Sequence, residues 1–166
     1  AHGVMVSVMA MTPIHLVNHG ESLQLVGLTI SLHIAGMFAL SPVFGILADR
    51  VGRITTILAG QALLIAAMLT ASFGQDSTVS VTIGLTLLGL GWSASTVAGS
   101  ALLTETSSEE HRTRRQGRSD LIMSLVGALG AIGAGVVLGG VGYGGLALSA
   151  LAIVAVVVLL APLARR

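Results

Sequence analysis

Long apolar segments alternate with short polar ones along the whole sequence. A helix of about 20 apolar residues spans a hydrocarbon core about 30 Å thick, and in lipid a helix satisfies its own backbone hydrogen bonds. The pattern therefore predicts an all-α membrane protein. We expect its six transmembrane helices at approximately 3–17, 24–48, 54–73, 78–104, 118–140 and 145–163.

Composition supports a membrane-embedded chain. Hydrophobic residues make up 54% of the 166 residues and charged residues 9%, whereas soluble domains carry about a quarter charged residues. The links between the apolar segments are short, so no soluble domain is left over. Because Ala1 leads almost directly into apolar sequence and no initiating Met precedes it, we expect the chain to be a fragment of a longer protein.

The basic residues indicate how the chain is oriented in the membrane. All eight are arginines, and they occur only in the second link, the fourth link and the C-terminal end. Basic residues next to membrane spans are retained in the cytoplasm, so we expect these regions and both termini to be cytoplasmic. The arginines also suit contact with lipid headgroups, and we do not expect nucleic-acid binding. They are Arg50, Arg53, Arg112, Arg114, Arg115, Arg118, Arg165 and Arg166.

The second link contains the most specific motif, "FGILADRVGR" from Phe44 to Arg53. Residues 45–53 match the signature G-x-L-A-D-R-x-G-R of the major facilitator superfamily, which the chain resembles. In that family the signature lies in the short cytoplasmic link between the second and third helices of a six-helix half. The matching residues, which we predict to form a cytoplasmic gating motif, are Gly45, Leu47, Ala48, Asp49, Arg50, Gly52 and Arg53.

The residue types in this motif suit a tight turn between two helices. Gly52 has the backbone freedom that the turn needs, and Gly45 lets a neighbouring helix approach closely. Asp49 can pair with Arg50 or Arg53, or face the positive N-terminal end of a helix. The resemblance implies that these contacts lock the cytoplasmic side in one state and break as two halves rock past each other. The alternative is a positively charged turn without a gating role.

The resemblance also implies a twelve-helix transporter of which this chain is one half. The segment 78–104 lacks the arginine often seen in the equivalent helix of an N-terminal half, and 118–140 lacks the Gly-Pro pair of many antiporters. The stretch "RRQGRSDLIMSLVGALGAIGAGVV" looks like the entry to the eleventh helix of bacterial, particularly actinobacterial, members. We therefore expect the C-terminal half, helices seven to twelve, with an N-terminal six-helix half as its missing partner.

Small residues at four-residue spacing indicate which helices pack closely, because helix association in lipid depends on close backbone approach. Such rows occur in the second, fourth and fifth segments, so we expect these segments to pack tightly. The third and sixth segments, 54–73 and 145–163, are nearly uniformly apolar and suit lipid contact. The rows are Gly27-Ser31-Ala35-Ala39, Gly91-Ser95-Gly99 and Gly127-Ala131-Gly135-Gly139.

Polar and aromatic residues within the spans are the candidates for a substrate cavity. His33 lies near the middle of its span, where it could bind substrate, carry a proton or only hydrogen-bond a neighbouring helix. Trp92 lies midway along its own span and could stack on a ligand or only pack. Gln61 is expected to hydrogen-bond between helices. The candidate cavity residues are His33, Trp92, Ser95, Thr96 and Met11.

Arg118 and Asp120 lie at the expected inner end of the fifth span. An acid near a helix N-terminus is favourable, so we interpret Asp120 as a cap or as part of an inner-gate ion pair rather than as a proton carrier. His15 and His19 have the i,i+4 spacing of metal ligands but lack a carboxylate or cysteine partner. We therefore expect neither a metal nor a cofactor.

The sequence thus predicts half of a secondary transporter that works by alternating access, with a small molecule held between the halves near the bilayer midplane. For a bacterial inner-membrane member, the resemblance implies drug or metabolite efflux coupled to protons, while substrate, direction and coupling ion stay open. The alternative is a self-contained six-helix protein, a channel subunit or structural partner that acts as a homodimer. No metalloprotease, serine protease or aspartyl protease motif occurs, so we do not expect an enzyme.

Overall fold

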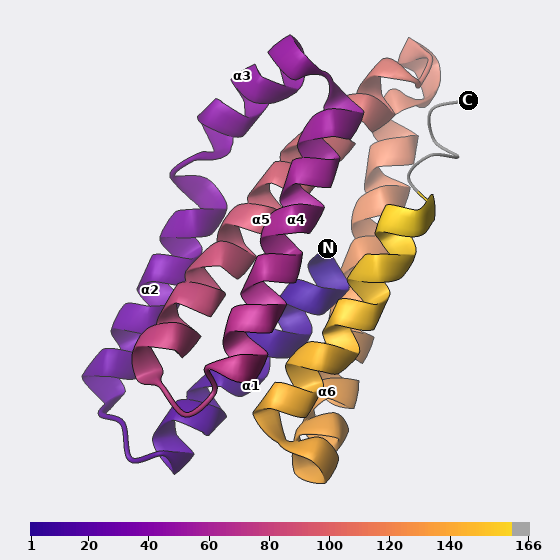
Figure 1. Ribbon diagram of the computed structural model, residues 1–166. Helices are drawn as coiled ribbons and strands as arrows, with labels where there is room; N and C mark the ends of the chain where they lie inside the picture. The colour runs from indigo at the N-terminus through magenta and orange to yellow at the C-terminus, as the bar shows by residue number, and fades with distance from the viewer. Residues whose placement is uncertain (161–166) are drawn as a thin grey trace.

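The fold is all-α, as the apolar pattern predicts. The computed structural model describes the backbone of residues 1–160 and the side chains of residues 1–159 (Figure 1). The predicted end of the last span, residues 161–163, lies outside the described residues, as do Arg165 and Arg166. Within the described part the helices are α1 His2–Asn18, α2 Leu23–Phe38, α3 Ser41–Val51, α4 Arg53–Phe73, α5 Thr78–Glu105 and α6 Glu109–Leu160.

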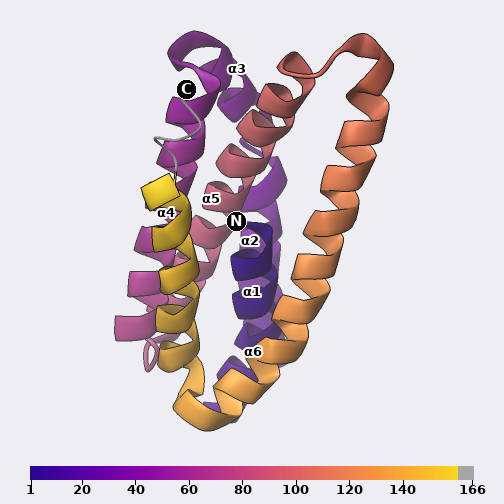
Figure 2. The same ribbon diagram turned by 90° about the vertical axis from the view of Figure 1, so that its right-hand side faces the viewer.

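The chain runs back and forth along an elongated bundle, with α2 and α3 together forming one pass and α1 starting near the middle (Figures 1 and 2). α6 contributes two of these passes, because the chain reverses at Gly142, whose φ of 71° and ψ of −177° are not helical. We name its two parts α6a, residues 109–141, and α6b, residues 143–160. The α3–α4 and α5–α6 links lie at one end of the bundle. The α1–α2 link, the α4–α5 link and the reversal at Gly142 lie at the other (Figure 1).

Four helical segments in the described residues are long and apolar enough to cross a membrane. α1, with 17 residues, is shorter than these, and α6 is helical on both sides of Gly142 without a separate link. The prediction of an all-α chain with several membrane-crossing segments is confirmed, whereas six separate spans stay a prediction. The four segments are Leu23–Val51, Arg53–Phe73, Thr78–Glu105 and Glu109–Leu159.

The predicted second span is not one continuous helix. α2 ends at Phe38 and α3 begins at Ser41, so the chain bends at Ala39 and Leu40. The reason is Pro42, which has no N–H to donate within a helix and whose ring clashes with the carbonyl group one turn earlier. Ser41 Oγ donates instead to the carbonyl oxygen of Phe38 at 2.8 Å. Beyond the bend, α3 packs against both α4 and α5.

The predicted fourth link is shorter than expected. α6 begins at Glu109, so residues 109–117 extend the helix, and the link comprises only residues 106–108. Glu, Arg and Gln are good helix formers, and the negative charges of Glu109 and Glu110 in the first turn favour a helix start at this point. The helix predicted to start at 118 therefore begins about two and a half turns earlier.

The most extensive helix contact joins α4 and α5. A Cβ atom on Gly91 would lie 2.9 Å from the carbonyl oxygen of Gly60 and 2.9 Å from the backbone nitrogen of Leu64. Since backbone atoms cannot give way as a flexible side chain does, only glycine permits this approach. Gln61 Nε2 donates to Ser95 Oγ at 2.9 Å across the same interface. The predicted interhelical hydrogen bond of Gln61 is therefore confirmed.

Two expectations about helix packing are wrong. α4 was expected to suit lipid contact, but it packs against both α5 and α6 and buries residues such as Gly60 and Ala67. The row Gly27-Ser31-Ala35-Ala39 of α2 is exposed, because α2 turns a different face, which includes His33 and Gly36, toward α5. A row of small residues marks a face that allows close packing, but it does not say which helix covers that face.

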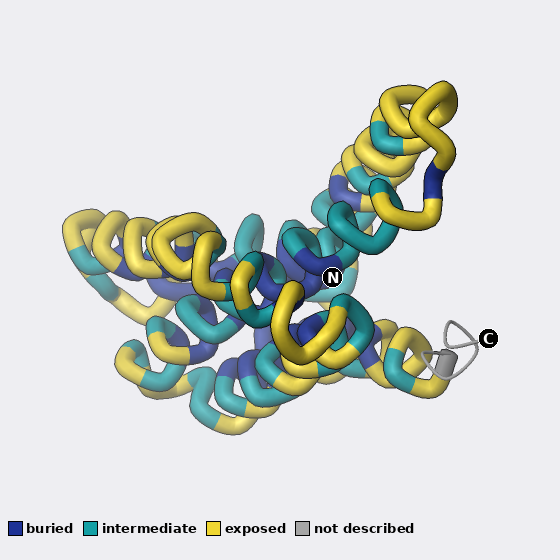
Figure 3. Tube along the Cα trace, turned by 90° about the horizontal axis from the view of Figure 1, so that it is seen from above, coloured by how far each residue is buried: buried dark blue, intermediate teal, exposed yellow. Residues whose placement is uncertain are grey.

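The other two rows pack only in part. In α5, Gly91 and Ser95 are buried, whereas a Cβ on Gly99 would meet no atom within 4 Å. In α6a, Gly127 approaches His2 of α1, whereas Gly135 and Gly139 face open space. Seen along the bundle, the buried residues gather near its middle and the outer helices carry most of the exposed ones (Figure 3). Open faces therefore remain on α2 and on α6a.

Candidate functional site

The arginines of the described residues gather at one end of the bundle. They lie on both sides of the α3–α4 turn and in the first turns of α6a, at the same end of the bundle (Figures 1 and 2). We call this end the basic end and the other the opposite end. The prediction that the links with arginines lie on one side is therefore confirmed for the described residues. The assignment of the basic end to the cytoplasm stays a prediction. The arginines are Arg50, Arg53, Arg112, Arg114, Arg115 and Arg118.

A single residue, Gly52, joins α3 to α4 at the basic end. Its φ is 98° and its ψ is 150°. Residues with a Cβ pay about 1–3 kcal/mol in such a conformation, and glycine does not. Thr56 Oγ1 donates to the carbonyl oxygen of Gly52 at 3.1 Å, which helps to hold the turn. The glycine of the motif therefore stands at the position where the turn needs a positive φ.

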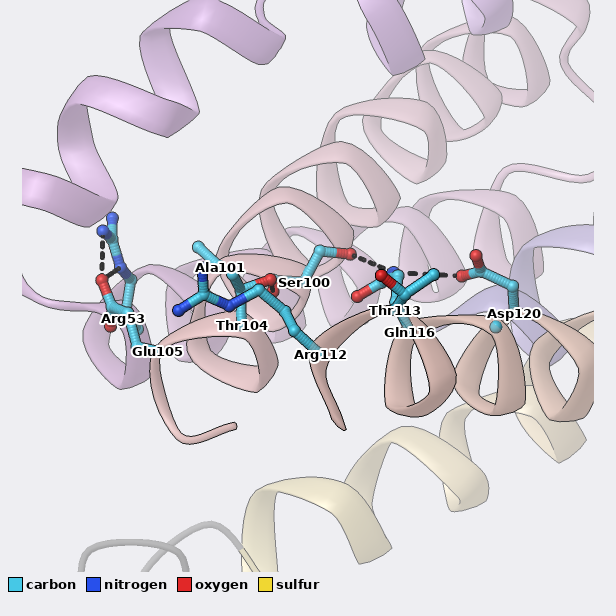
Figure 4. A pocket seen from close by; sticks show the side chains of 10 residues that line it. Arg53, Ser100, Ala101, Thr104, Glu105, Arg112, Thr113, Gln116 and Asp120 are labelled. Carbon is cyan, nitrogen blue, oxygen red and sulfur yellow. Dashed lines mark hydrogen bonds and ion pairs between the residues drawn. The ribbon is translucent and has the colours of Figure 1, made fainter. Parts of the chain in front are cut away.

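Arg53 joins two carboxylates that come from different helices. Its Nη1 pairs with Oδ1 of Asp49, four residues earlier in the last turn of α3. Its Nε and Nη2 donate to Oε1 of Glu105, at the end of α5, at 3.0 and 2.6 Å (Figure 4). The side chain of Arg53 is 20% exposed, whereas those of Asp49 and Glu105 are 65% and 52% exposed. Most of the Arg53 side chain is thus covered, while both carboxylates keep contact with water.

Each of these ion pairs is weak because water reaches the carboxylates. An exposed pair contributes about 0.2–1 kcal/mol, so two pairs change an equilibrium constant by at most about 30-fold. The shared guanidinium nevertheless ties the α3–α4 turn to the end of α5, two segments that are far apart in the sequence. Ion pairs this weak can hold the turn against the end of α5 and can also break.

Glu105 is a member of this network that the sequence interpretation missed. The motif directed attention to Asp49 and its neighbouring arginines, and Glu105 was assigned to the polar link. A signal was present, because the alternating topology places the end of the apolar segment 78–104 at the same end of the bundle as Arg53. Glu105 is the first acidic residue after that segment. An acid at the basic end was therefore available to pair with the motif.

The remaining motif residues differ in their surroundings. Ala48 is 2% exposed and is the buried residue of α3, and Leu47 is half-buried. Arg50 is exposed, and the described residues provide it with no ion pair. A Cβ on Gly45 would meet no described atom within 4 Å. The close helix approach expected at Gly45 is therefore not made by any helix of the described chain.

The structure does not bring Arg118 and Asp120 together. Residues two apart point to different sides of a helix, and each lines a different cleft. Asp120 accepts a hydrogen bond from Gln116 Nε2 at 3.2 Å. The expected capping role is wrong, because α6 starts at Glu109 and Asp120 lies about three turns inside it.

Two clefts open between α5 and α6a. The larger, of about 730 Å³, lies beside the contact between Arg53 and Glu105 and is bounded on the α6a side by residues that include Asp120 (Figure 4). The smaller, of about 350 Å³, is lined by Ser95 and Thr96 of α5 and shares Asp120 with the larger. Three predicted candidates therefore border neighbouring clefts, which offer hydroxyl groups and the carboxylates of Glu105 and Asp120.

The other cavity candidates lie elsewhere. Trp92 Nε1 donates to Nδ1 of His2 at 3.0 Å, and its ring meets Phe38 edge to face. His33 is completely buried, and its Nδ1 donates to the carbonyl oxygen of Leu85 in α5 at 2.7 Å. Of the three roles considered for His33, this geometry matches the hydrogen bond to a neighbouring helix. Met11 is half-buried on α1 and lines neither of the two clefts.

Comparison with known proteins decides the family. The family model described as Major Facilitator Superfamily matches residues 2–166. The chain belongs to the major facilitator superfamily. Its members in this comparison are transporters, so the expectation that the chain is not an enzyme is confirmed. The transport and membrane assignments made from the motif are confirmed at the level of the family.

Three relatives are much longer than the stretch that aligns with this chain. The uncharacterized MFS-type transporters YddS and YdeG of Bacillus subtilis (strain 168) are 40% and 39% identical to it, each over 136 residues. The riboflavin transporter RfnT of Brucella anthropi is 32% identical over 139 residues. The alignments cover 81%, 81% and 83% of this chain but only 31%, 32% and 34% of the relatives. The chain thus spans about a third of their length, and no solved structure matches it.

Proposed function

We propose that this chain is the C-terminal six-helix half, helices seven to twelve, of a bacterial secondary transporter that works by alternating access. The observation that carries the proposal is the contact of Arg53 with both Asp49 and Glu105. It joins the turn of the family signature to α5 at the basic end. We assign this end to the cytoplasmic side of the inner membrane, because basic residues next to membrane spans are retained in the cytoplasm. α1 begins beside the middle of α5, where Trp92 donates to His2, so the predicted cytoplasmic N-terminus is not part of this assignment.

The contact acts as a lock at the basic end. It exists only while the α3–α4 turn lies against the end of α5, so it stabilises one conformation of the transporter. Since each ion pair contributes only about 0.2–1 kcal/mol, thermal motion and substrate binding are sufficient to open it. Its loss lowers the population of the closed conformation and thereby slows the cycle.

The missing partner is the N-terminal six-helix half. The exposed small-residue row of α2, Gly27-Ser31-Ala35-Ala39, is a face on which another helix can pack closely. On α6a, Gly135 and Gly139 leave similar open space. Relatives about two and a half times as long as this chain contain enough sequence for such a partner. Substrate is then held between the two halves near the bilayer midplane.

The transported substrate is a small molecule, and we propose proton-coupled efflux of a drug or metabolite. The clefts beside Ser95, Thr96 and Asp120 offer hydroxyl groups and the carboxylates of Glu105 and Asp120 for hydrogen bonding. One relative carries the name riboflavin transporter, which makes riboflavin a sensible first compound to test.

The test is transport by the full-length parent protein in proteoliposomes, against a panel of drugs and metabolites that includes riboflavin. We expect movement of at least one compound and a dependence of its rate on an imposed pH gradient. Transport without any pH dependence would overturn proton coupling. Robust transport by the 166 residues alone would overturn the assignment as a half and favour the self-contained homodimer.

A further inference from the structure

At the opposite end of the bundle, Gln75 contacts two different helices at once. It lies in the α4–α5 link, between Phe73 and Thr78. Its backbone carbonyl oxygen accepts a hydrogen bond from Nε2 of His15 in α1 at 2.8 Å. Its side-chain Oε1 accepts one from the backbone N–H of Gly144 in α6b at 2.8 Å. One residue thus links α1, the α4–α5 link and α6b.

The bond to Gly144 serves as a helix cap supplied from a distant part of the chain. Gly144 lies in the first turn of α6b, just after the reversal at Gly142, where backbone N–H groups have no partner within the helix. A Cβ on Gly144 would lie 2.8 Å from Oε1 and 3.0 Å from Cδ of Gln75. A Cβ at this position would therefore push the amide side chain away from its present contact with the N–H group.

Two further contacts hold α1 against the start of α6b. The rings of His15 and Tyr143 stack with centroids 4.2 Å apart and an interplanar angle of 11°. The Tyr143 hydroxyl lies 2.9 Å from Thr12 Oγ1. Thr12 already donates its own proton to the carbonyl oxygen of Val8, so the tyrosine is the donor. All three side chains are buried, with Thr12 completely so.

The two ends of the bundle are therefore held by contacts of different kinds. At the basic end the carboxylates of Asp49 and Glu105 are half-exposed, and water competes for the charges. At the opposite end Gln75 is half-buried, and its hydrogen-bond partners are the buried His15 ring and the backbone N–H of the buried Gly144. Breaking such a bond leaves a buried polar group unsatisfied, which costs more than separating an exposed ion pair.

We propose that Gln75 is a positioning residue that fixes the opposite end of α1 against α6b. These helices and the α4–α5 link then stay together as one unit while the contacts at the basic end form and break. The effect on turnover rests on the transport function proposed above, whereas the fixed distance between the helices is measured without transport.

The experiment measures one distance in the full-length protein. The 166-residue chain contains no cysteine. Once any cysteine elsewhere in the full-length protein is replaced, Val17→Cys in the last turn of α1 and Val141→Cys beside the reversal introduce two specific spin-labelling sites. Both positions are accessible, with exposed fractions of 47% and 61%. Double electron–electron resonance then reports the distance distribution between the end of α1 and the reversal that leads into α6b.

Three substitutions separate the acceptor role of Gln75 from simple space filling. Gln75→Glu keeps a side-chain oxygen that can accept the hydrogen bond from the Gly144 N–H group. Gln75→Met keeps the length of the side chain but has no oxygen acceptor. Gly144→Ala places a methyl group where the Gln75 amide now lies. We expect one narrow distance distribution, unchanged by substrate or a pH gradient, in the parent and in Gln75→Glu. We expect a broadened distribution in Gln75→Met and Gly144→Ala. Size-exclusion profiles of all variants identify any that fail to fold.

Transport gives the second readout. We expect turnover in Gln75→Met to fall by about three- to tenfold, the factor for one lost hydrogen bond, with KM unchanged and Gln75→Glu close to the parent. A distance that changes with substrate in the parent, or Gln75→Met that matches Gln75→Glu in both readouts, would overturn the positioning role. If no compound is transported at all, the proposed function fails, and the distance measurement still decides the role of Gln75.

Discussion

Arg53 and Glu105 lie 52 residues apart in the chain, yet Nε and Nη2 of the arginine both donate to one oxygen of the glutamate, at 3.0 and 2.6 Å. Arg53 begins α4 directly after the signature turn, and Glu105 ends α5. The same guanidinium group pairs with Asp49. Any movement that separates the turn from the end of α5 must therefore break at least one of these pairs.

The first prediction concerns the two carboxylates. Asp49→Asn and Glu105→Gln each remove one charge from Arg53 and keep the size of the side chain. Because each pair contributes at most about 1 kcal/mol, we expect turnover to slow by about two- to fivefold with little change in KM. Initial rates of the full-length protein in proteoliposomes measure both quantities. Glu110→Gln, an exposed acid in the first turn of α6a, is the matched control, and equal rates in all variants would argue against the lock.

The second prediction concerns the turn. Gly52→Ala places a Cβ on a residue with φ of 98°, so we expect a loss of stability of about 1–3 kcal/mol and a lower melting temperature in detergent. Gly133→Ala is the control, because Gly133 is helical and a Cβ there would meet no atom within 4 Å. An unchanged melting temperature for Gly52→Ala would mean that the turn relaxes to a different conformation.

The third prediction concerns the contact between α4 and α5. Gly91→Ala would bring a Cβ within 2.9 Å of backbone atoms of Gly60 and Leu64, so the helices must separate. We expect a destabilisation of about 1–3 kcal/mol, measured by thermal unfolding of the full-length protein. Gly99→Ala lies in the same row of the same helix but faces open space, so it should leave the unfolding temperature unchanged. Equal effects of the two substitutions would contradict the observed packing.

The alternation of the chain between two ends was predictable, whereas the breaks within its helices were less so. The arginines occur only in alternate links, and the structure places those links of the described chain at one end. The apolar pattern hid the bend at Pro42, since proline interrupts a helix without interrupting its hydrophobic character. It also hid the early start of α6, because a polar sequence can be helical when it contains good helix formers.

The candidate site was only partly predictable for a different reason. Asp49, Arg53 and Gly52 are neighbours in the sequence, so their motif was visible as a local pattern. Glu105 joins them through tertiary contact, and the clefts beside Asp120 arise from the relative placement of α5 and α6a. The small-residue row of α2 showed a face suited to close packing, but sequence spacing alone could not show that α5 covers another face.

The fourth prediction concerns that exposed row. Ala35→Leu adds a large side chain to a face of α2 that is open in the described chain and that we assign to the other half. We expect it to destabilise the full-length protein by about 1–3 kcal/mol, as overpacking of an interface does. Ala59→Leu, at an exposed position of α4, is the matched control and should be tolerated. If Ala35→Leu melts at the same temperature as the control, this face of α2 is not the interface.

The most direct test of the lock is to prevent it from opening. Arg53→Cys with Glu105→Cys in the full-length protein allows a short bifunctional thiol reagent to hold the α3–α4 turn against the end of α5, and the single-cysteine variants control for the reagent itself. We predict that transport stops after cross-linking and returns to the level of the untreated double variant when the cross-link is reduced. Transport that continues at the same rate in the cross-linked protein would contradict the claim that this contact breaks in each cycle.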